Sequence, residues 1–268
     1  MKWVKRILLG AVGVIGLAVL AIAGVVAFDS LFPAQTAADF TNVSYPGTDG
    51  RRLGAYLARP QGPGPFPAVL LVHEFYGINA DIIKKADLLA QQGYLALAVD
   101  AYRGRTTRQI PRAIWLVITT PQDEIAADID AGYAYLAALP EVQAQRIGSV
   151  GFCFGGTQVM HMAARRSELA ATVIFYGSGP ITDPGALGVM DQGGPVLGIY
   201  GAQDSSIPLD EVNGFELALQ ARGVPHRVTI YPGVGHAFVS TQTIAQPGAA
   251  QDAWQEMLDF LDETLNGS

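Results

Sequence analysis

Cysteine is almost absent from this chain: Cys153 is the only one in 268 residues. A single cysteine cannot form an internal disulfide, so the protein is not a disulfide-stabilised scaffold. The sequence also lacks a C-x-x-C pair, an H-E-x-x-H motif and a G-x-x-x-x-G-K-[ST] loop, and the glycines around Cys153 do not form a dinucleotide-binding fingerprint. We therefore expect no metal and no cofactor.

Charged residues are also scarce, at 15%, and most of them are acidic. Three of the 17 Lys and Arg residues lie within the first six positions, so the remainder carries 14 against 24 Asp and Glu, a net charge of −10. A nucleic-acid-binding domain presents a basic face, and this balance argues against nucleic acid as a partner. Half of the residues are apolar, which suffices for a large buried core.

One long stretch, residues 7–28, contains no charge and follows a short basic segment. As a helix it would cover about 30 Å, the thickness of the hydrocarbon core of a bilayer. The cations before it should stay in the cytoplasm, which places the rest of the chain outside. A cleaved signal peptide with its A-x-A site at residues 21–23 is the alternative, and it also exports the domain. The expected organisation is a cytoplasmic stub (1–6), a transmembrane helix (7–28), a linker (29–39) and one domain (40–268).

From residue 40 onward, strand-like and helix-like segments alternate. Short apolar runs and alternating segments predict strands, and longer amphipathic segments predict helices. Such alternation implies right-handed crossovers and a mostly parallel sheet, which together form a doubly wound α/β domain. The expected strands are 40–46, 53–60, 67–74, 94–100, 146–152, 171–177, 195–201 and 226–233, and the expected helices are 78–93, 123–139, 155–166, 209–223 and 253–265.

The single cysteine lies between a predicted strand and a predicted helix, in the stretch Gly151-Phe152-Cys153-Phe154-Gly155. This has the form of the nucleophile elbow G-x-S-x-G, with sulfur in place of oxygen. The glycines remove Cβ atoms that would collide across the sharp turn. The helix that follows points its positive end at the sulfur, which favours the thiolate. A small buried apolar residue is the alternative, but the glycine spacing favours a nucleophile.

A thiol nucleophile needs a base, and the chain has four histidines. His236 lies in a glycine-rich loop after the last predicted strand, from which its ring could reach over the edge of the sheet. His161 lies within a helix, His226 begins a strand beside an arginine, and His73 ends a buried strand. The position of His236 favours it as the base.

The acid that orients the base should lie between nucleophile and histidine in the chain, as in α/β-hydrolases. Asp204 follows the predicted strand 195–201 and occupies that place. Asp210 and Glu211 fit the first turn of a helix better. Nucleophile, acid and base then each follow a different strand, which predicts a catalytic triad.

With these residues placed, the chain resembles the dienelactone hydrolase family of the α/β-hydrolase fold. The similarity covers approximately residues 40–265 and rests on the stretches VLLVHEFYG, GYLALAVDAYRGR, VGFCFGG, GIYGAQD and YPGVGHAF. The resemblance implies that Cys153 attacks an ester or lactone carbonyl, with His236 and Asp204 as its partners. It also implies that Glu74 lies against the thiol and takes part in the proton exchange that exposes the thiolate.

The resemblance further implies an oxyanion hole made by the backbone N–H groups of Phe75 and Phe154. The founding enzyme of the family holds the carboxylate of its substrate with two arginines. Arg103 or Arg105 can supply the first of these, whereas the second position is Ser240. The chemistry is therefore better indicated than the substrate.

The segment 103–121 departs further from the family, since it carries four arginines and then an apolar run. It is expected to be a loop and helix that cover the sheet. The alternative is a rim that touches lipid headgroups or admits an apolar or acidic substrate.

These observations predict a hydrolase that cleaves small-molecule ester or lactone bonds through an acyl-cysteine intermediate. We expect it to be anchored to the membrane by the N-terminal helix, with the catalytic domain extracytoplasmic, and a monomer is favoured. The alternatives are a non-catalytic binding module and a redox sensor built on the exposed thiol. The combination of nucleophile, base, acid and glutamate argues against the binding module, and a redox sensor would have no second cysteine as an internal resolving partner.

Overall fold

The apolar runs of the sequence form the strands of one sheet in the computed structural model, which describes residues 2–31 and 35–267. Among these residues eight strands are joined in the order β1-β2-β4-β3-β5-β6-β7-β8. The strands are β1 (Val43–Pro46), β2 (Arg52–Ala58), β3 (Phe66–Val72), β4 (Leu95–Val99), β5 (Val142–Phe152), β6 (Ala171–Phe175), β7 (Val196–Gly201) and β8 (His226–Tyr231). The predicted α/β class and the positions of the strands are confirmed.

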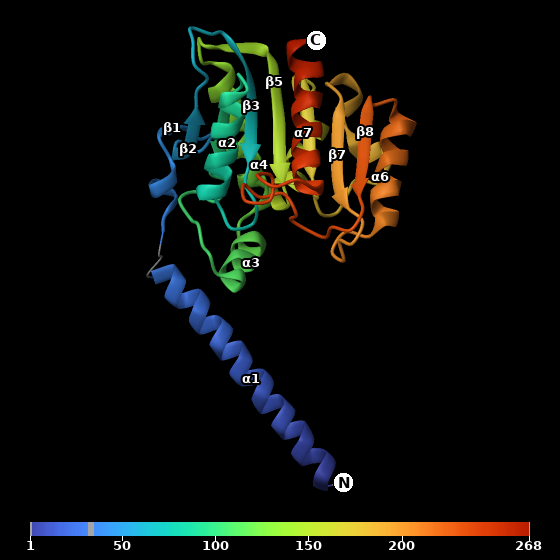
Figure 1. Cartoon of the computed structure of the whole chain (residues 1–268). Coiled ribbons are helices and arrows are strands. Elements are labelled where there is room, and N and C mark those ends of the chain that lie inside the picture. Colours follow the sequence, from blue (N-terminus) through green and yellow to red (C-terminus); the bar gives the residue numbers. More distant parts are fainter. Residues whose placement is uncertain (1, 32–34, 268) are drawn as a thin grey trace.

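The sheet is mixed. β1 pairs antiparallel with β2 and β2 antiparallel with β4, whereas all other neighbours are parallel. In the parallel part, Val72 at the end of β3 lies beside Gly151 near the end of β5, and Gly201 lies beside Tyr231 at the ends of β7 and β8. The carboxyl ends of these strands therefore meet at one edge of the sheet, as Figure 1 shows.

Helices cover both faces of the sheet. α2 and α7 lie in front of it in Figure 1, while α4 and α5 contact each other and both pack on β3 and β5. Every residue of β4, β6 and β7 is buried, as expected for strands covered on both faces. The helices are α1 (Lys2–Leu31), α2 (Ala80–Gln91), α3 (Ile110–Thr119), α4 (Gln122–Ala137), α5 (Phe154–Arg165), α6 (Leu209–Arg222) and α7 (Ala249–Leu261), with short helical turns η1 (Ala37–Phe40), η2 (Pro184–Leu187), η3 (Met190–Gln192) and η4 (Asp262–Asn266).

Local sequence signals set the helix ends. The side chain of Asn79 accepts hydrogen bonds from the backbone N–H groups of Asp81 and Ile82, which caps α2 as its position in the sequence predicts. Gly93 follows the same helix with φ +93°, a conformation that glycine adopts without strain.

The N-terminal segment differs from its prediction. Residues 2–31 form one helix, α1, which projects away from the sheet (Figure 1). Within the described part of the chain, none of the helices combines the length and the apolar character needed to cross a bilayer. The predicted transmembrane helix over 7–28 is therefore not supported. Of the predicted linker, 29–39, the first residues belong to α1, η1 begins at Ala37, and 32–34 lie outside the described residues.

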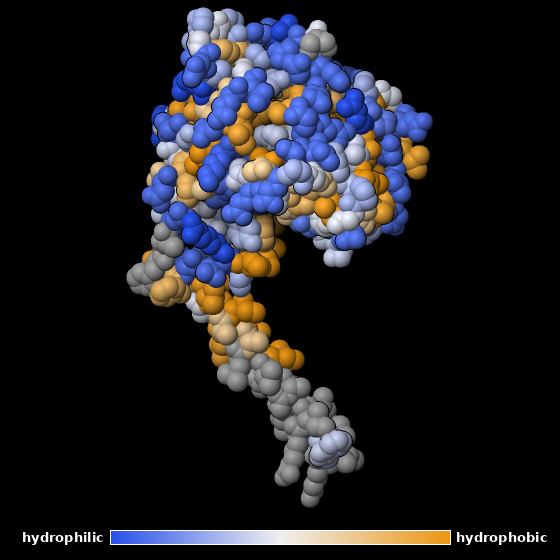
Figure 2. All heavy atoms as spheres, in the orientation of Figure 1, coloured by the Kyte–Doolittle hydropathy of each residue, from blue (hydrophilic) through white to orange (hydrophobic). Residues whose placement is uncertain are grey.

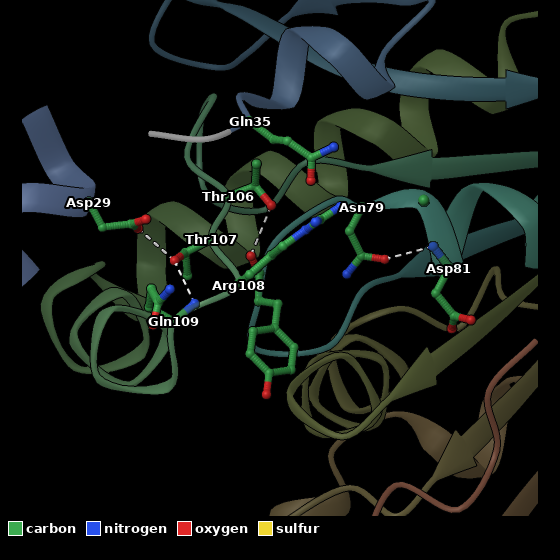
Figure 3. Close-up of a pocket in the computed structure, with 10 residues that line it drawn as sticks. Asp29, Gln35, Asn79, Asp81, Thr106, Thr107, Arg108 and Gln109 are labelled. Carbon is green, nitrogen blue, oxygen red and sulfur yellow. Dashed lines mark hydrogen bonds between the residues drawn. The ribbon is translucent and has the colours of Figure 1, made fainter. Parts of the chain in front are cut away.

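The end of α1 contacts the domain beside α3. Thr107 donates a hydrogen bond from Oγ1 to Oδ2 of Asp29 at 2.6 Å (Figure 3). The same contact closes one side of a cavity of about 330 Å³, which Asn79 and Arg108 also line. α1 and α3 thus meet at the end of the domain where the parallel strands finish.

Candidate active site

The predicted site residues come from the carboxyl ends of four parallel strands. Glu74 follows β3, Cys153 follows β5, Asp204 follows β7 and His236 follows β8. Because these ends share one edge of the sheet, the four side chains converge although up to 162 positions separate them in the sequence.

The turn at Cys153 is sharp and strained. Cys153 has φ +54° and ψ −114°, a backbone conformation that residues other than glycine rarely adopt. The residues two positions before and after it must be glycine: a Cβ atom on Gly151 would lie 2.0 Å from the carbonyl oxygen of Gly155, and one on Gly155 would lie 2.1 Å from that of Val72. The predicted purpose of the glycines, to avoid such collisions, is confirmed.

The structure brings Cys153, His236 and Asp204 together. Nε2 of His236 lies 3.1 Å from the sulfur of Cys153, and Nδ1 of the same ring lies 2.6 Å from Oδ2 of Asp204. Both distances are within hydrogen-bonding range. The ring can therefore accept the proton of the thiol while the carboxylate fixes its orientation.

Ser206 also belongs to this arrangement, because it hydrogen-bonds Asp204. It was not predicted as a site residue from the sequence. Its backbone N–H and its hydroxyl donate to Oδ1 of Asp204 at 2.9 and 2.6 Å, and its Oγ lies 3.3 Å from Nδ1 of His236. Burial alone would raise the pKa of Asp204, but the hydrogen bonds from Ser206 and His236 outweigh it and lower the pKa. The only sequence signal is a serine two residues after an aspartate, which is typical of many ordinary turns.

The pKa of the Cys153 thiol is not lowered, contrary to the prediction from the sequence. Burial, followed by the charge of Glu74, raises the pKa of Cys153 to about 11, although the backbone N–H groups of Phe154 and Phe75 donate hydrogen bonds to the sulfur and oppose the shift. Desolvation, which the sequence did not indicate, and the nearby carboxylate of Glu74 thus oppose the expected preference for the thiolate. The two N–H groups predicted to bind an oxyanion do converge on this sulfur.

Glu74 lies close enough to Cys153 for its charge to act on the thiol. Burial raises the pKa of Glu74, while Lys85 and His236 oppose the shift. A carboxylate with a raised pKa binds a proton more readily near neutral pH. The proton-exchange role implied by the family resemblance is thus compatible with its position.

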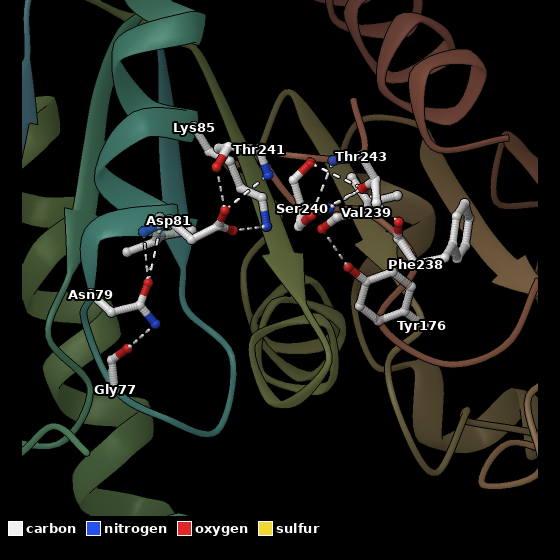
Figure 4. A network of polar contacts seen from close by, with 11 residues as sticks. Gly77, Asn79, Asp81, Lys85, Tyr176, Phe238, Val239, Ser240, Thr241 and Thr243 are labelled. Atoms are coloured by element: carbon white, nitrogen blue, oxygen red, sulfur yellow. Dashed lines mark hydrogen bonds and ion pairs between the residues drawn. The ribbon is translucent and has the colours of Figure 1, made fainter. Parts of the chain in front are cut away.

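A polar network holds the loop that carries His236 (Figure 4). Asp81, in the first turn of α2, accepts hydrogen bonds from the backbone N–H and the hydroxyl of Thr241 at 2.8 and 2.6 Å. Its other oxygen lies 2.8 Å from Nζ of Lys85, which is 1% exposed and stands 3.9 Å from the centroid of the Phe152 ring. The network connects α2 to the loop only five residues beyond His236.

The other three histidines lie apart from the sulfur. His73 is fully buried between Glu74 O and the N–H of Ala101, and burial lowers its pKa to about 4, so it remains neutral. His161 is exposed on α5, and Nδ1 of His226 contacts Val224 O. Of the histidines, only His236 contacts Cys153 in the described structure.

The two arginines predicted to bind substrate are held elsewhere. Arg103 makes a bidentate ion pair with the buried Asp128, at 2.5 and 2.9 Å, and also contacts Asp49 and Glu124. Arg105 donates to the carbonyl of Tyr102 and the hydroxyl of Thr120. The structure does not bring either guanidinium to the cavity above the sulfur.

That cavity measures about 680 Å³ and opens over Cys153 and His236. Phe75, Val117 and the exposed face of α3 form much of its lining, and Gln122, Gln158 and Ser178 add polar groups. Segment 103–121 thus supplies part of the wall of the site through α3, which lies beyond the ends of the strands in Figure 1 and not over a face of the sheet. In the described residues no cluster of three or more His, Cys, Asp and Glu side chains could hold a metal ion.

Known proteins share this arrangement of sequence and fold. The profile of the "Dienelactone hydrolase family" matches residues 53–265. A "Putative carboxymethylenebutenolidase" of Synechocystis sp. is 33% identical over 229 residues, which cover 80% of this chain and 93% of the relative. A "Probable 2-oxo-3-(5-oxofuran-2-ylidene)propanoate lactonase" of Bradyrhizobium sp. is 34% identical over 232 residues, covering 82% and 93%.

A solved structure of similar sequence confirms the fold. The "Putative Dienelactone Hydrolase" of Klebsiella pneumoniae superposes with a TM-score of 0.70 and 32% identity, covering 83% of this chain and all of the other. The resemblance stated from the sequence motifs is thereby confirmed. The chain belongs to the dienelactone hydrolase family and is a hydrolase that acts on ester or lactone bonds.

Proposed function

We propose that this protein hydrolyses small-molecule esters or lactones through an acyl-cysteine intermediate. The single observation that carries the proposal is the hydrogen-bonded chain from the sulfur of Cys153 through His236 to Asp204, with contacts of 3.1 and 2.6 Å. Such a chain places a base at the nucleophile and an orienting acid at the base.

The first step begins from a protonated sulfur, since the pKa of Cys153 is about 11. As the sulfur bonds to the substrate carbonyl carbon, its proton passes to Nε2 of His236 or to the carboxylate of Glu74. The carbonyl oxygen becomes negative and accepts hydrogen bonds from the N–H groups of Phe75 and Phe154. Each such donor typically lowers the barrier by about 3 kcal/mol.

In the second half of the reaction the protonated base gives its proton to the departing alkoxide. A water molecule, deprotonated by His236, then attacks the thioester carbon. The C–S bond breaks, the carboxylic acid leaves and the thiol is restored. Asp204 stays ionised throughout and stabilises the positive imidazole.

Burst kinetics with p-nitrophenyl acetate test the proposal. We expect a burst of p-nitrophenol close to one equivalent of enzyme, and Cys153→Ala should abolish both the burst and turnover. His236→Ala should reduce kcat/KM by about a thousandfold or more, because acid–base catalysis and thiol activation are lost together. His161→Ala, which removes an exposed histidine away from the site, is the matched control and should retain full activity.

Full turnover in the Cys153→Ala variant would rule out the acyl-cysteine route. A wild-type thiol that is inert to iodoacetamide and to esters would favour the non-catalytic binding module instead. The predicted location of the domain outside the cytoplasm, drawn from the basic segment before residues 7–28, stays a prediction, as does the monomeric state.

A further inference from the structure

The cavity above the sulfur has the size of a small-molecule site. Its volume of about 680 Å³ lies within the range of roughly 300 to 1,000 Å³ that such sites occupy. Its apolar lining comes from two places: the aromatic rings of Phe75 and Phe154 beside the nucleophile, and α3 at the mouth.

No described residue that lines the cavity carries a fixed charge. The polar side chains there are amides and hydroxyls, such as Gln122, Gln158 and Thr157, and the only titratable groups are Cys153 and His236. A substrate carboxylate that entered this space would lose water without gaining a cation, which costs free energy.

Two basic side chains, the predicted substrate ligand Arg103 and the buried Lys85, already have acidic partners. Arg103 is bound by Asp128 and Lys85 by Asp81, their side chains are 12% and 1% exposed, and neither lines the cavity. Releasing either one for a substrate would leave its own carboxylate unpaired, at a further cost.

α3 leaves apolar side chains uncovered at the mouth. Ile114 and Ile118 are one turn apart on the same face, line the cavity, and are 49% and 71% exposed. Figure 2 shows hydrophobic surface gathered where α3 meets the end of α1. An apolar group that lies between α3 and the two aromatic rings would remove these isoleucines from water and gain their hydrophobic contact.

We propose that this cavity selects esters whose bound group is apolar and uncharged, and that α3 provides the binding face for that group. The proposal rests on the function proposed above and names its substrate class. The bound group is the acyl chain or the alcohol part of the ester, and substrates that carry a carboxylate on it are disfavoured.

Two series of substrates test this selectivity. One lengthens the acyl chain of p-nitrophenyl esters from acetate through butyrate to hexanoate, and the other lengthens the alcohol of acetate esters from methyl to hexyl. In at least one series kcat/KM should rise roughly twofold to fourfold per added methylene, as expected for partial burial of each group. Mono-p-nitrophenyl adipate, which replaces the terminal methyl of the hexanoate by a carboxylate, should react at least about tenfold more slowly than the hexanoate.

A charge placed on α3 tests the binding face. Ile118→Lys puts a cation at the mouth, and the ratio of adipate to hexanoate activity should rise by roughly threefold to tenfold. Ile110→Lys is the matched control: it adds the same charge to an exposed position of the same helix, outside the cavity lining. It lies about 12 Å further along the helix, beyond the screening length of about 8 Å at physiological salt, so the ratio should stay within about twofold.

The outcomes separate this inference from the proposed mechanism. Two flat series would overturn the substrate class even if Cys153→Ala abolished hydrolysis of p-nitrophenyl acetate, and so would a rising acyl series in which the adipate reacts as fast as the hexanoate. An equal response of the Ile118 and Ile110 variants would show that α3 does not bind the substrate. Turnover of acetate without Cys153 would instead overturn the mechanism.

Discussion

At the scale of single residues, the surroundings of the Cys153 sulfur act on its pKa in two opposite directions. The N–H groups of Phe75 and Phe154 favour its negative form, whereas burial and the nearby Glu74 disfavour it and prevail. A thiol held protonated in this way reacts more slowly with alkylating agents and oxidants than a thiolate does. In the proposed mechanism the same carboxylate is one of the two groups that can accept the proton of the thiol, so activation there requires only that the negative charge moves from Glu74 to the sulfur.

Replacing Glu74 by glutamine should lower the pKa of Cys153 from its value of about 11, because the neighbouring negative charge is removed. Iodoacetamide reacts with the thiolate, so alkylation at about pH 8 should become severalfold faster and the midpoint of its pH profile should move to lower pH. Glu211→Gln, at an exposed position of α6, is the control and should leave the profile unchanged. A midpoint that stays in place or rises in Glu74→Gln would show that this carboxylate does not act on the sulfur.

At the scale of elements, the strand ends could be predicted and the connections between side chains could not. Cys153, Asp204 and His236 each follow an apolar run, and their order along the chain agrees with an α/β-hydrolase, so the sequence identified three groups that the fold brings together. Lys84 and Lys85 look alike in the sequence. Only the packing of α2 against Phe152 decides that Lys85 is buried and paired.

The elbow between β5 and α5 leaves no room for a side chain at Gly155. Gly155→Ala should lower the free energy of unfolding by about 3 kcal/mol or more, and abolish activity, since its Cβ would overlap the backbone of Val72 and His73. Gly193→Ala is the control: its Cβ would meet ordinary contacts at 3.5 Å and beyond, and it should cost less than about 1 kcal/mol. Chemical denaturation measures both, and equal stabilities would contradict the tight elbow.

The connection between α2 and the His236 loop should make stability depend on pH. Burial alone would raise the pKa of Asp81, but its ion pair with Lys85 and its hydrogen bonds from Thr241 outweigh burial and lower the pKa. As pH falls below about 4, the unfolded chain therefore takes up this proton before the folded chain does, and the stabilisation is lost.

Asp81→Asn should remove that pH-dependent contribution and leave the cation of Lys85 buried without its partner. The free energy of unfolding at about pH 6 should fall by about 2 kcal/mol, and its decline in the acid range should become shallower. Urea denaturation across pH measures both effects, and Asp210→Asn, at an exposed site, is the control. A variant with unchanged stability and an unchanged acid slope would show that the network contributes nothing.

At the scale of the whole molecule, the reactive edge of the sheet and α3 lie at the same end of the domain, where α1 also joins (Figure 1). Much of the limited positive charge of the domain serves to connect its parts. Arg103 follows β4 and binds Asp49 in the β1–β2 turn as well as Glu124 and Asp128 on α4. The family resemblance suggested this arginine as a substrate ligand, and the sequence could not show that a partner 25 residues away would be buried beside it.

Arg103→Ala distinguishes a structural role of this arginine, in ion pairs within the domain, from a role in binding substrate. Because Asp128 is buried, loss of its bidentate partner should lower the free energy of unfolding by about 3 kcal/mol. In the fraction that stays folded, kcat/KM for neutral and for carboxylate-bearing esters should change in parallel, since the guanidinium does not line the cavity. Arg51→Ala, which removes an exposed ion pair to the same Asp49, is the control and should cost less than about 1 kcal/mol. Chemical denaturation and steady-state kinetics on the same preparations measure both effects. An unchanged stability together with a raised KM for the carboxylate ester alone would show that Arg103 binds substrate.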